Sequence, residues 1–189
     1  MRTLPIAITA LAATLTLTLT ACGGDDGGGG DKKTGSGTGS GKSSSSSACA
    51  ADKLGQEVVA SEAPAAGDTG TVSATLTNES GADCTLEGFP SVDLIAGGTT
   101  LAVAADKSAK PEKLTVKQDE TVSFTITYVR GPAGDAAKSA AVGTVKFGLP
   151  GADAADTGQL SFAWKYGEVA LRSGGEPDAS VTPLQRAGD

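Results

Sequence analysis

The clearest pattern in the chain is a strict alternation of apolar and polar residues. It spans residues 120–130, and from Thr121 to Tyr128 every second residue is apolar and the residues between are Thr or Ser. The apolar positions are Val122, Phe124, Ile126 and Tyr128. A period of two is typical of a β-strand that buries one face. Residues 69–78 and 159–166 show the same period, so we expect strands there as well.

Turn residues separate further short apolar segments from residue 49 onward. Strands are predicted over residues 56–61, 69–78, 84–88, 92–96, 100–104, 113–117, 120–130, 143–149, 159–172 and 179–184. A break at Gly167 is an alternative to one long strand over 159–172. Residues 105–111 and 134–141 are expected to be loops. Many short strands without a sustained helical period predict an all-β fold, an antiparallel β-sandwich.

A polar turn followed by a cysteine divides the first half of this region. Residues 76–90 read LTNESGADCTLEGFP; they close one predicted strand and open the next at Cys84. The turn residues are Asn78, Ser80, Gly81 and Asp83. Asn and Asp side chains bond to nearby backbone and Gly accepts positive φ, which is why such residues favour a turn. The Asn78-Glu79-Ser80 sequon matters only in a secreted eukaryotic protein.

Residues 1–21 are predicted to be a lipoprotein signal peptide. Arg2 precedes an apolar stretch that is too short and too rich in Thr for a membrane span. Leu19-Thr20-Ala21-Cys22 resembles a lipobox, which places cleavage before Cys22 and lipidation on its thiol. The alternative is an ordinary secretory leader with an incidental cysteine. Because two or three acyl chains anchor stably, we expect an extracytoplasmic protein held through Cys22 on the outer face of the cell membrane.

Residues 22–48 are predicted to be the lipidated cysteine and a flexible Gly/Ser linker. In residues 23–48, 17 of 26 are Gly or Ser, and no apolar period is present, so the segment cannot bury enough surface to order itself. Residues 37–43 resemble a phosphate-binding loop, but Ser36 stands where the motif requires its first glycine, and no predicted strand precedes it. We interpret this stretch as linker.

Residues 49–189 are expected to form a single domain with an acidic surface. They contain 11 basic and 19 acidic residues, a net charge of −8. Nucleic acids and anionic lipids require a basic surface, so we expect neither as a partner. The chain has no histidine, which removes the commonest general base and the commonest zinc ligand. Aromatic residues make up only 4% of the chain and are expected in the core.

Several of these motifs together resemble the actinobacterial domain-of-unknown-function 4232 family. The resemblance rests on Cys49, on LTN-x-S and CTL-x-G-x-P-x-V-x-L within residues 76–94, and on a strand pair around residues 117–120. It covers about residues 49–186. The resemblance implies an immunoglobulin-like β-sandwich, often carried on a lipoprotein or membrane anchor, and brings no biochemical activity. Many members have further cysteines in the second half; this chain has none there, so no second disulfide is transferred.

With Cys22 lipidated, Cys49 and Cys84 remain as a pair in an oxidising compartment, and we expect them to form a disulfide. Closing a loop of about 36 residues stabilises a fold by roughly 3 to 4 kcal/mol on the chain-entropy model. The alternative is a nucleophilic thiolate, which needs a neighbouring base. A chain without histidine does not favour it.

Acidic pairs are the other candidates for chemistry. They are Asp119 with Glu120, Asp153 with Asp156, and Glu176 with Asp178. All fall in predicted turns, so we interpret them as turn residues and not as the separated acids of a hydrolase. Asp153 and Asp156 could help to bind calcium, but they lack the spacing of a known calcium loop. We expect no metal and no cofactor.

Phe89 and Pro90 stand at a strand end and have two interpretations. A Phe beside a Pro is more often packed into the domain. The alternative is an exposed binding surface, which would gain support if Trp164 or Tyr166 lay nearby.

These observations predict a monomeric, non-enzymatic module of the cell envelope that binds another envelope protein or a wall polymer. A small-ligand or metal-binding lipoprotein is the alternative, and an enzyme is the least favoured class. An exposed apolar or aromatic patch would indicate the first. A closed pocket with convergent polar groups would indicate the second, and a carboxylate pair of raised pKa in a cleft would indicate the third.

Overall fold

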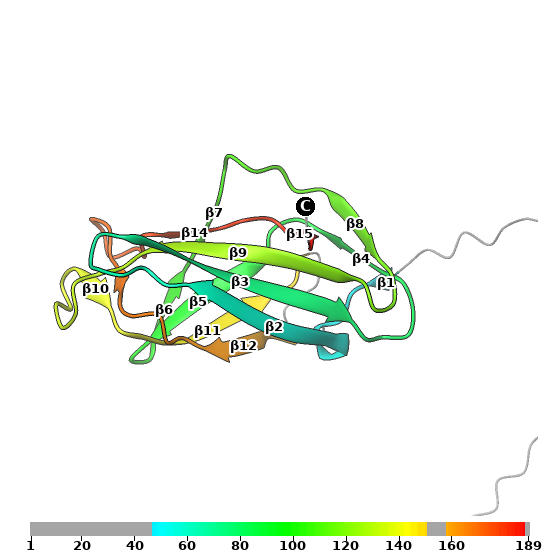
Figure 1. The fold of residues 1–189 in the computed structure, drawn as a ribbon, viewed down its shortest axis with the longest axis horizontal. Helices are drawn as coiled ribbons and strands as arrows, with labels where there is room; N and C mark the ends of the chain where they lie inside the picture. Colours follow the sequence, from blue (N-terminus) through cyan, green and yellow to red (C-terminus); the bar gives the residue numbers. More distant parts are fainter. Residues whose placement is uncertain (1–46, 151–157, 188–189) are drawn as a thin grey trace, which may run out of the picture. The chain divides into compact units, whose positions relative to one another are not determined.

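The computed structural model describes residues 47–150 and 158–187, all of which lie in one compact unit, Ser43–Asp189. The regular structure is almost entirely β (Figure 1), and the one helix among the described residues is the short 3-10 helix η1, Ala51–Lys53. No helix in this part of the chain is long and apolar enough to cross a membrane. The all-β prediction is confirmed.

The strands follow the chain in this order: β1 (Ser47–Ala48), β2 (Leu54–Ser61), β3 (Thr69–Asn78), β4 (Cys84–Glu87), β5 (Ser91–Ala96), β6 (Thr99–Ala102), β7 (Ala104–Ala105), β8 (Lys113–Val116), β9 (Thr121–Val129), β10 (Ser139–Ala140), β11 (Val142–Gly148), β12 (Leu160–Ala163), β13 (Val169–Ala170), β14 (Ala179–Val181) and β15 (Gln185–Arg186).

The largest sheet has six strands in the order β2-β3-β9-β14-β7, with β15 also paired to β9. Its pairs are antiparallel except for β14 and β7, which are parallel. A second sheet, β12-β11-β5-β6, is antiparallel throughout and carries one irregularity between Val142 and Thr144. The parallel pairing of β7 with β14 departs from the purely antiparallel arrangement that the sequence predicts.

Two smaller sheets complete the pairing. β1, β4 and β8 form one, in which β1 is parallel to β4 and β8 is antiparallel to it. β10 and β13 form the other, an antiparallel pair. The predicted linker over residues 22–48 lies outside the described residues except for its last two, Ser47 and Ala48, which are ordered as β1.

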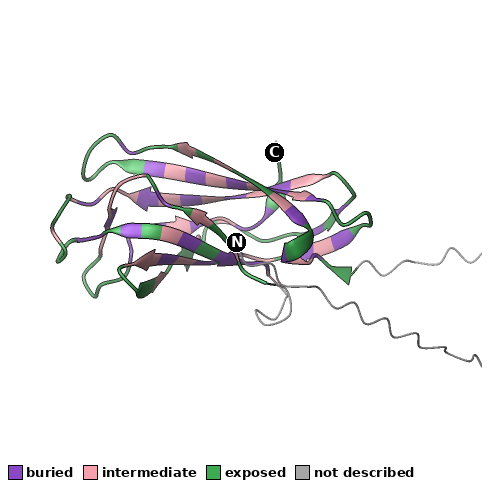
Figure 2. Ribbon diagram, turned by 90° about the horizontal axis from the view of Figure 1, so that it is seen from below, coloured by how far each residue is buried: buried purple, intermediate pink, exposed green. Residues whose placement is uncertain are grey.

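The core lies between the six-stranded and the four-stranded sheets. In β3 and β9 every second residue is buried and the residues between are half-buried or exposed, as the bands along the strands of Figure 2 show. Phe124 on β9 meets Phe147 on β11 with ring centroids 5.0 Å apart. Both rings are almost fully buried. Burying one such side chain stabilises a fold by about 1.5 to 3 kcal/mol.

The chain passes from the four-stranded sheet to the six-stranded sheet at Val103, between β6 and β7. β6 pairs with β5 in the four-stranded sheet, whereas β7 pairs with β14 in the six-stranded sheet. Val103 lies between them, is buried, and donates its N–H to the carbonyl of Val92 (2.8 Å). The strand expected over residues 100–104 is therefore two strands.

Two other expected strands are interrupted. The segment 159–172 is strand only in β12 and β13, and the break between them contains Gly167, at φ +85°, whose carbonyl accepts the indole N–H of Trp164 (2.7 Å). The expected alternative, a break at Gly167, is the one the structure has. The segment 179–184 is interrupted between β14 and β15 by Pro183, which has no N–H to donate. The remaining predicted strands agree with the structure to within one or two residues.

Candidate functional site

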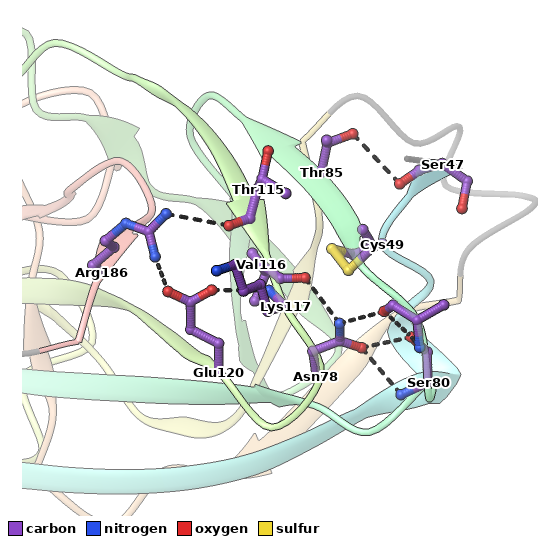
Figure 3. The surroundings of a disulfide bond; sticks show 12 residues. Ser47, Cys49, Asn78, Ser80, Thr85, Thr115, Val116, Lys117, Glu120 and Arg186 are labelled. Atoms are coloured by element: carbon purple, nitrogen blue, oxygen red, sulfur yellow. Dashed lines mark hydrogen bonds and ion pairs between the residues drawn. A yellow bond between two sulfur atoms is a disulfide. The ribbon is translucent and has the colours of Figure 1, made fainter. Parts of the chain in front are cut away.

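A disulfide between Cys49 and Cys84 lies at the end of the domain where the linker is expected to join it (Figure 3). The Cα atoms are 4.9 Å apart, and the residues are only 1% and 5% exposed. Cys49 donates its N–H to the carbonyl of Thr85 (3.1 Å), and Cys84 is the first residue of β4. Each sulfur is bonded to the other, so neither is available as a nucleophile.

Asn78 fixes the turn that follows β3. Its side chain is fully buried, and its Nδ2 donates to the carbonyls of Ala82 (2.8 Å) and Val116 (3.0 Å). Its Oδ1 accepts from the N–H (3.0 Å) and the hydroxyl (2.7 Å) of Ser80. The polar turn expected here is present, and the amide is occupied by these partners. A buried side chain of this kind is not a glycosylation acceptor.

The acidic pair Asp119 and Glu120 belongs to the turn between β8 and β9 (Figure 3). Glu120 Oε2 accepts the N–H of Lys117 (2.8 Å), and Oε1 forms an ion pair with Arg186. Arg186 also donates to the carbonyl of Thr115 (3.2 Å). Asp119 is exposed and has φ +61°, a left-handed conformation that Asp adopts more readily than most residues. The two carboxylates do not face each other across a cleft.

The other acidic pairs do not form a site in the described residues. Asp178 accepts two hydrogen bonds from Arg172 (2.9 and 2.7 Å), and Glu176 is exposed. Asp153 and Asp156 lie outside the described residues. Within residues 47–150 and 158–187, no three His, Cys, Asp or Glu residues gather as a metal site would require.

The carboxylate of Glu168 joins two segments that are distant in the sequence. It accepts hydrogen bonds from the hydroxyl of Ser139 and from the N–H of Gly134 (2.9 Å). These two bonds, the Ser139 bond first, lower the pKa of Glu168 below its ordinary value. Ser139 is itself buried, and its hydroxyl oxygen also lies 2.6 Å from the carbonyl oxygen of Pro132. The arrangement holds the 132–139 loop against the start of β13.

Phe89 and Pro90 form a packed corner in the structure. Pro90 is buried and Phe89 is half-buried. Gly88, at φ +125°, approaches Pro150 so closely that an added Cβ would lie 3.1 Å from the proline ring. The burial fits the packing interpretation of this pair, while a binding role for Phe89 stays a prediction.

Trp164 and Tyr166 pack with Tyr128 and not with Phe89. Ring centroids are 4.9 Å apart between Tyr128 and Trp164, and 5.0 Å apart between Trp164 and Tyr166. The Tyr128 hydroxyl accepts the N–H of Ala63 (3.3 Å) and donates to the carbonyl of Tyr166 (2.9 Å). Burial is the main cause of the raised pKa of Tyr166. Tyr128 and Trp164 belong to the buried core, and Tyr166 packs against it.

A partly open groove of about 390 Å³ lies between the 106–112 loop and β15. Its apolar residues include Leu114 and Leu184, and its polar residues include Lys110, Gln185 and Arg186. Asp106, which begins the loop, accepts the N–H (2.9 Å) and hydroxyl (2.7 Å) of Ser108, and these bonds lower its pKa. The pattern predicts only a loop here, because the groove forms between segments far apart in the sequence.

The residues from the disulfide to β15 correspond to a known sequence family. The model of the domain of unknown function (DUF4232) matches residues 49–185, more than half of the 189-residue chain. The chain belongs to the DUF4232 family. A comparison with curated proteins gave no match. The DUF4232 match begins at Cys49, the first residue of the disulfide, and ends at Gln185 in β15.

Proposed function

We propose that this DUF4232 protein is a non-catalytic lipoprotein of an actinobacterial cell envelope whose β domain binds another envelope component. The signal peptide of residues 1–21 exports it, Cys22 carries the lipid, and residues 23–48 hold the domain away from the membrane. The protein acts outside the cytoplasm, as a monomer. Its partner is an envelope protein or a wall polymer.

The observation that carries this proposal is the position of the disulfide. Cys49, the first residue after the predicted linker, is bonded to Cys84 in β4. Disulfides persist in oxidising compartments, which fits an exported domain. The bond also fixes the first residue of the domain covalently to a buried strand, as suits a domain held by its N-terminal end.

The chemistry of the described residues supports a non-catalytic role. The disulfide occupies both cysteines of the domain, and the chain has no histidine. Glu120 and Asp178, each from a candidate acidic pair, are each paired with an arginine. Binding and structural roles require neither a free thiol nor a histidine.

We further infer that the two main sheets form an immunoglobulin-like sandwich. The contact of Phe124 with Phe147 across the core and the change of sheet at Val103 support this architecture. An experimental structure in which β9 and β11 do not face each other would contradict it.

Metabolic labelling with a fatty-acid analogue tests the lipid anchor. The wild-type chain should incorporate the label and fractionate with membranes, whereas Cys22→Ala should lose both properties. Ser36→Ala in the linker serves as the control and should behave as the wild type. Incorporation that persists in Cys22→Ala would reject Cys22 as the lipidated residue.

Crosslinking in the native cells, followed by mass spectrometry, tests the binding role. A reproducible envelope partner should be captured by the intact, membrane-held chain. If a known envelope complex is captured in the same cells and this chain captures nothing, the binding role fails.

A small-ligand function is the second candidate, and the groove beside Lys110 is the observation that favours it. Its volume falls within the range of natural ligand sites. Native mass spectrometry of the protein purified from its own cells should then show a bound small molecule that Lys110→Glu releases. Lys146→Glu, an exposed position on β11, is the matched control.

A further inference from the structure

β2 forms one margin of the six-stranded sheet. One edge pairs with β3 over eight consecutive residue pairs, from Leu54 with Asn78 to Ser61 with Thr71, without a bulge. In residues 47–150 and 158–187, no strand pairs with its other edge, which Figure 1 shows at the border of the sheet beyond β3. The backbone N–H and C=O groups on that edge are a template for another strand.

The edge of β2 carries little of the usual protection against strand pairing. Natural edge strands are kept short or bulged, or carry Pro or charged side chains, Lys above all. The other strands at sheet margins are β1, β7, β10, β13 and β15, with two residues each, and β6, β8 and β12, with four each. β2 has eight residues and contains neither Pro nor Lys, and Glu57 is its one charged residue. It is therefore the longest and least protected edge in the described structure.

The most exposed apolar side chain lies on this same strand. Val59 is 61% exposed and is the one large hydrophobic residue classed as exposed in the described parts of the chain. Its partner on β3 is Ser73, so Val59 points to the face away from the core. An apolar residue on an added strand would remove Val59 from water.

The surroundings of this edge are acidic. Glu57, two residues before Val59, points to the same face, and both Glu57 and Glu62 are exposed. The carboxylate of Glu79 lies over Gly55, where it occupies the space of a Cβ. The nearest lysine, Lys53, is paired with the neighbouring Asp52 (3.2 Å).

One cation lies at the far end of this edge, beyond Ser61. Arg130 donates to the carbonyls of Ala63 (2.8 Å) and Pro64 (3.3 Å), which orients its guanidinium toward that loop. The carboxylates of Glu57 in β2 and of Glu62 and Glu79 beside it therefore set the charge that an added strand would meet.

We propose that β2 is a strand-addition site that takes an extended, positively charged segment of another envelope protein. The added strand continues the six-stranded sheet through backbone hydrogen bonds. It places an apolar side chain opposite Val59 and, two residues away on the same face, a Lys or Arg opposite Glu57. A second copy of this chain fits less well, because pairing two β2 strands brings the two sets of carboxylates together. The inference rests on the proposed binding function and names its site and the class of its partner.

A photocrosslinking amino acid placed at Val59 of the full lipidated chain, in its own cells, tests the site. The same probe at Thr100 on β6 and at Lys110 beside the groove provides comparison positions, since both residues are exposed. Crosslinked peptides are sequenced by mass spectrometry. We expect capture at Val59 of a segment with alternating apolar residues and a Lys or Arg two positions from the crosslink.

A charge reversal tests the chemistry of the partner. Glu57→Lys, in the chain with the probe at Val59, should lower the captured amount at least about fivefold, because an attractive cross-strand pair becomes repulsive. Glu87→Lys, the same change at an exposed residue of β4, should leave capture unchanged. A synthetic peptide of the captured segment should slow hydrogen exchange of the amides in residues 55–61.

The remaining outcomes contradict the proposal in distinguishable ways. Crosslinks from Thr100 or Lys110 alone would leave the binding function standing and reject β2 as its site. Capture at Val59 of a second copy of this chain, of an acidic segment or of a wall polymer would reject the basic peptide. Equal capture by the Glu57→Lys and Glu87→Lys chains would also reject a basic peptide as the partner. If no position captures anything, both the site and the binding function fail.

Discussion

The side-chain amide of Asn78 donates a hydrogen bond to the carbonyl of Val116 (3.0 Å), across 38 residues of sequence. The turn after β3 is thereby fixed to β8, a strand of a different sheet. The same side-chain amide also bonds to Ala82 and Ser80 within the turn. One buried side chain therefore holds the turn together and fixes it to β8.

Replacing Asn78 should be costly. Asn78→Ala leaves the buried carbonyl of Val116 without its donor, and we expect the free energy of unfolding to fall by about 3 kcal/mol. Ser80→Ala removes bonds at an exposed residue and should cost about 1 kcal/mol or less. Urea unfolding measures both. Equal effects of the two substitutions would contradict the role assigned to Asn78.

Removal of the disulfide should lower stability without changing the fold. Cys49→Ala with Cys84→Ala opens a loop with a sequence separation of 35, and the chain-entropy model gives a loss of about 3 to 4 kcal/mol. Urea unfolding of the double variant should match that of the reduced wild-type domain. Alkylation of the unreduced wild-type protein should find no free thiol at Cys49 or Cys84. A reactive thiol at either position would overturn the disulfide.

Gly70 is required by the ring of Tyr128. The two residues are paired across β3 and β9, and a Cβ on Gly70 would lie 2.6 Å from a ring carbon of Tyr128. Gly70→Ala should therefore destabilise the domain by about 1 to 3 kcal/mol, and by less in a Tyr128→Leu background. Gly143→Ala is the control, because no atom beyond its chain neighbours lies within 4 Å of an added Cβ. Additive effects of Gly70→Ala and Tyr128→Leu would argue against the contact.

The Glu168 carboxylate should make stability depend on pH in the acid range. Its hydrogen bonds from Ser139 and Gly134 lower its pKa in the folded state below the ordinary value of 4.5. The contribution of Glu168 to the free energy of unfolding is therefore fully present above its unfolded-state pKa and is lost as the pH falls through its folded-state pKa.

Urea midpoints at pH 7 and pH 3 test this linkage. Glu168→Gln should be less stable than the wild type at pH 7, and the difference should shrink toward pH 3. Ser139→Ala, which removes the main cause of the shift, should show the same trend. A difference between Glu168→Gln and the wild type that is constant from pH 7 to pH 3 would exclude the linkage.

The long strands could be predicted because their burial follows a local rule. β9 is recognisable from Val122, Phe124 and Ile126 alone, since the period of two needs no knowledge of the partner strands. β1, β10 and β13 have two residues each, too few to show a period, and the sequence does not predict them as separate strands. The interruption between β12 and β13 contains Gly167, where the sequence offers a break as the alternative to one long strand.

The candidate sites were less accessible to sequence reasoning. The turn at Asn78 follows from residue type, but its bond to Val116 depends on which strand lies beside the turn. The groove between Leu114 and Leu184 forms from segments that are distant in the sequence. The exposure of Val59 requires knowing that β2 lies at the border of its sheet, and strand order is a property of the whole fold.

The disulfide also determines how the domain responds to mechanical tension applied at its N-terminal end. A force on the chain before Cys49 can peel β1 from β4, but it then reaches Cys84 through the sulfur atoms. The residues between the two cysteines cannot be drawn out while that bond is intact. At about 3.3 to 3.6 Å per residue, roughly 120 Å of contour length stays hidden from a pulling experiment until the bond is reduced. β2 and β3 lie within that protected loop, so the edge proposed to bind a partner keeps its connections while the linker is stretched.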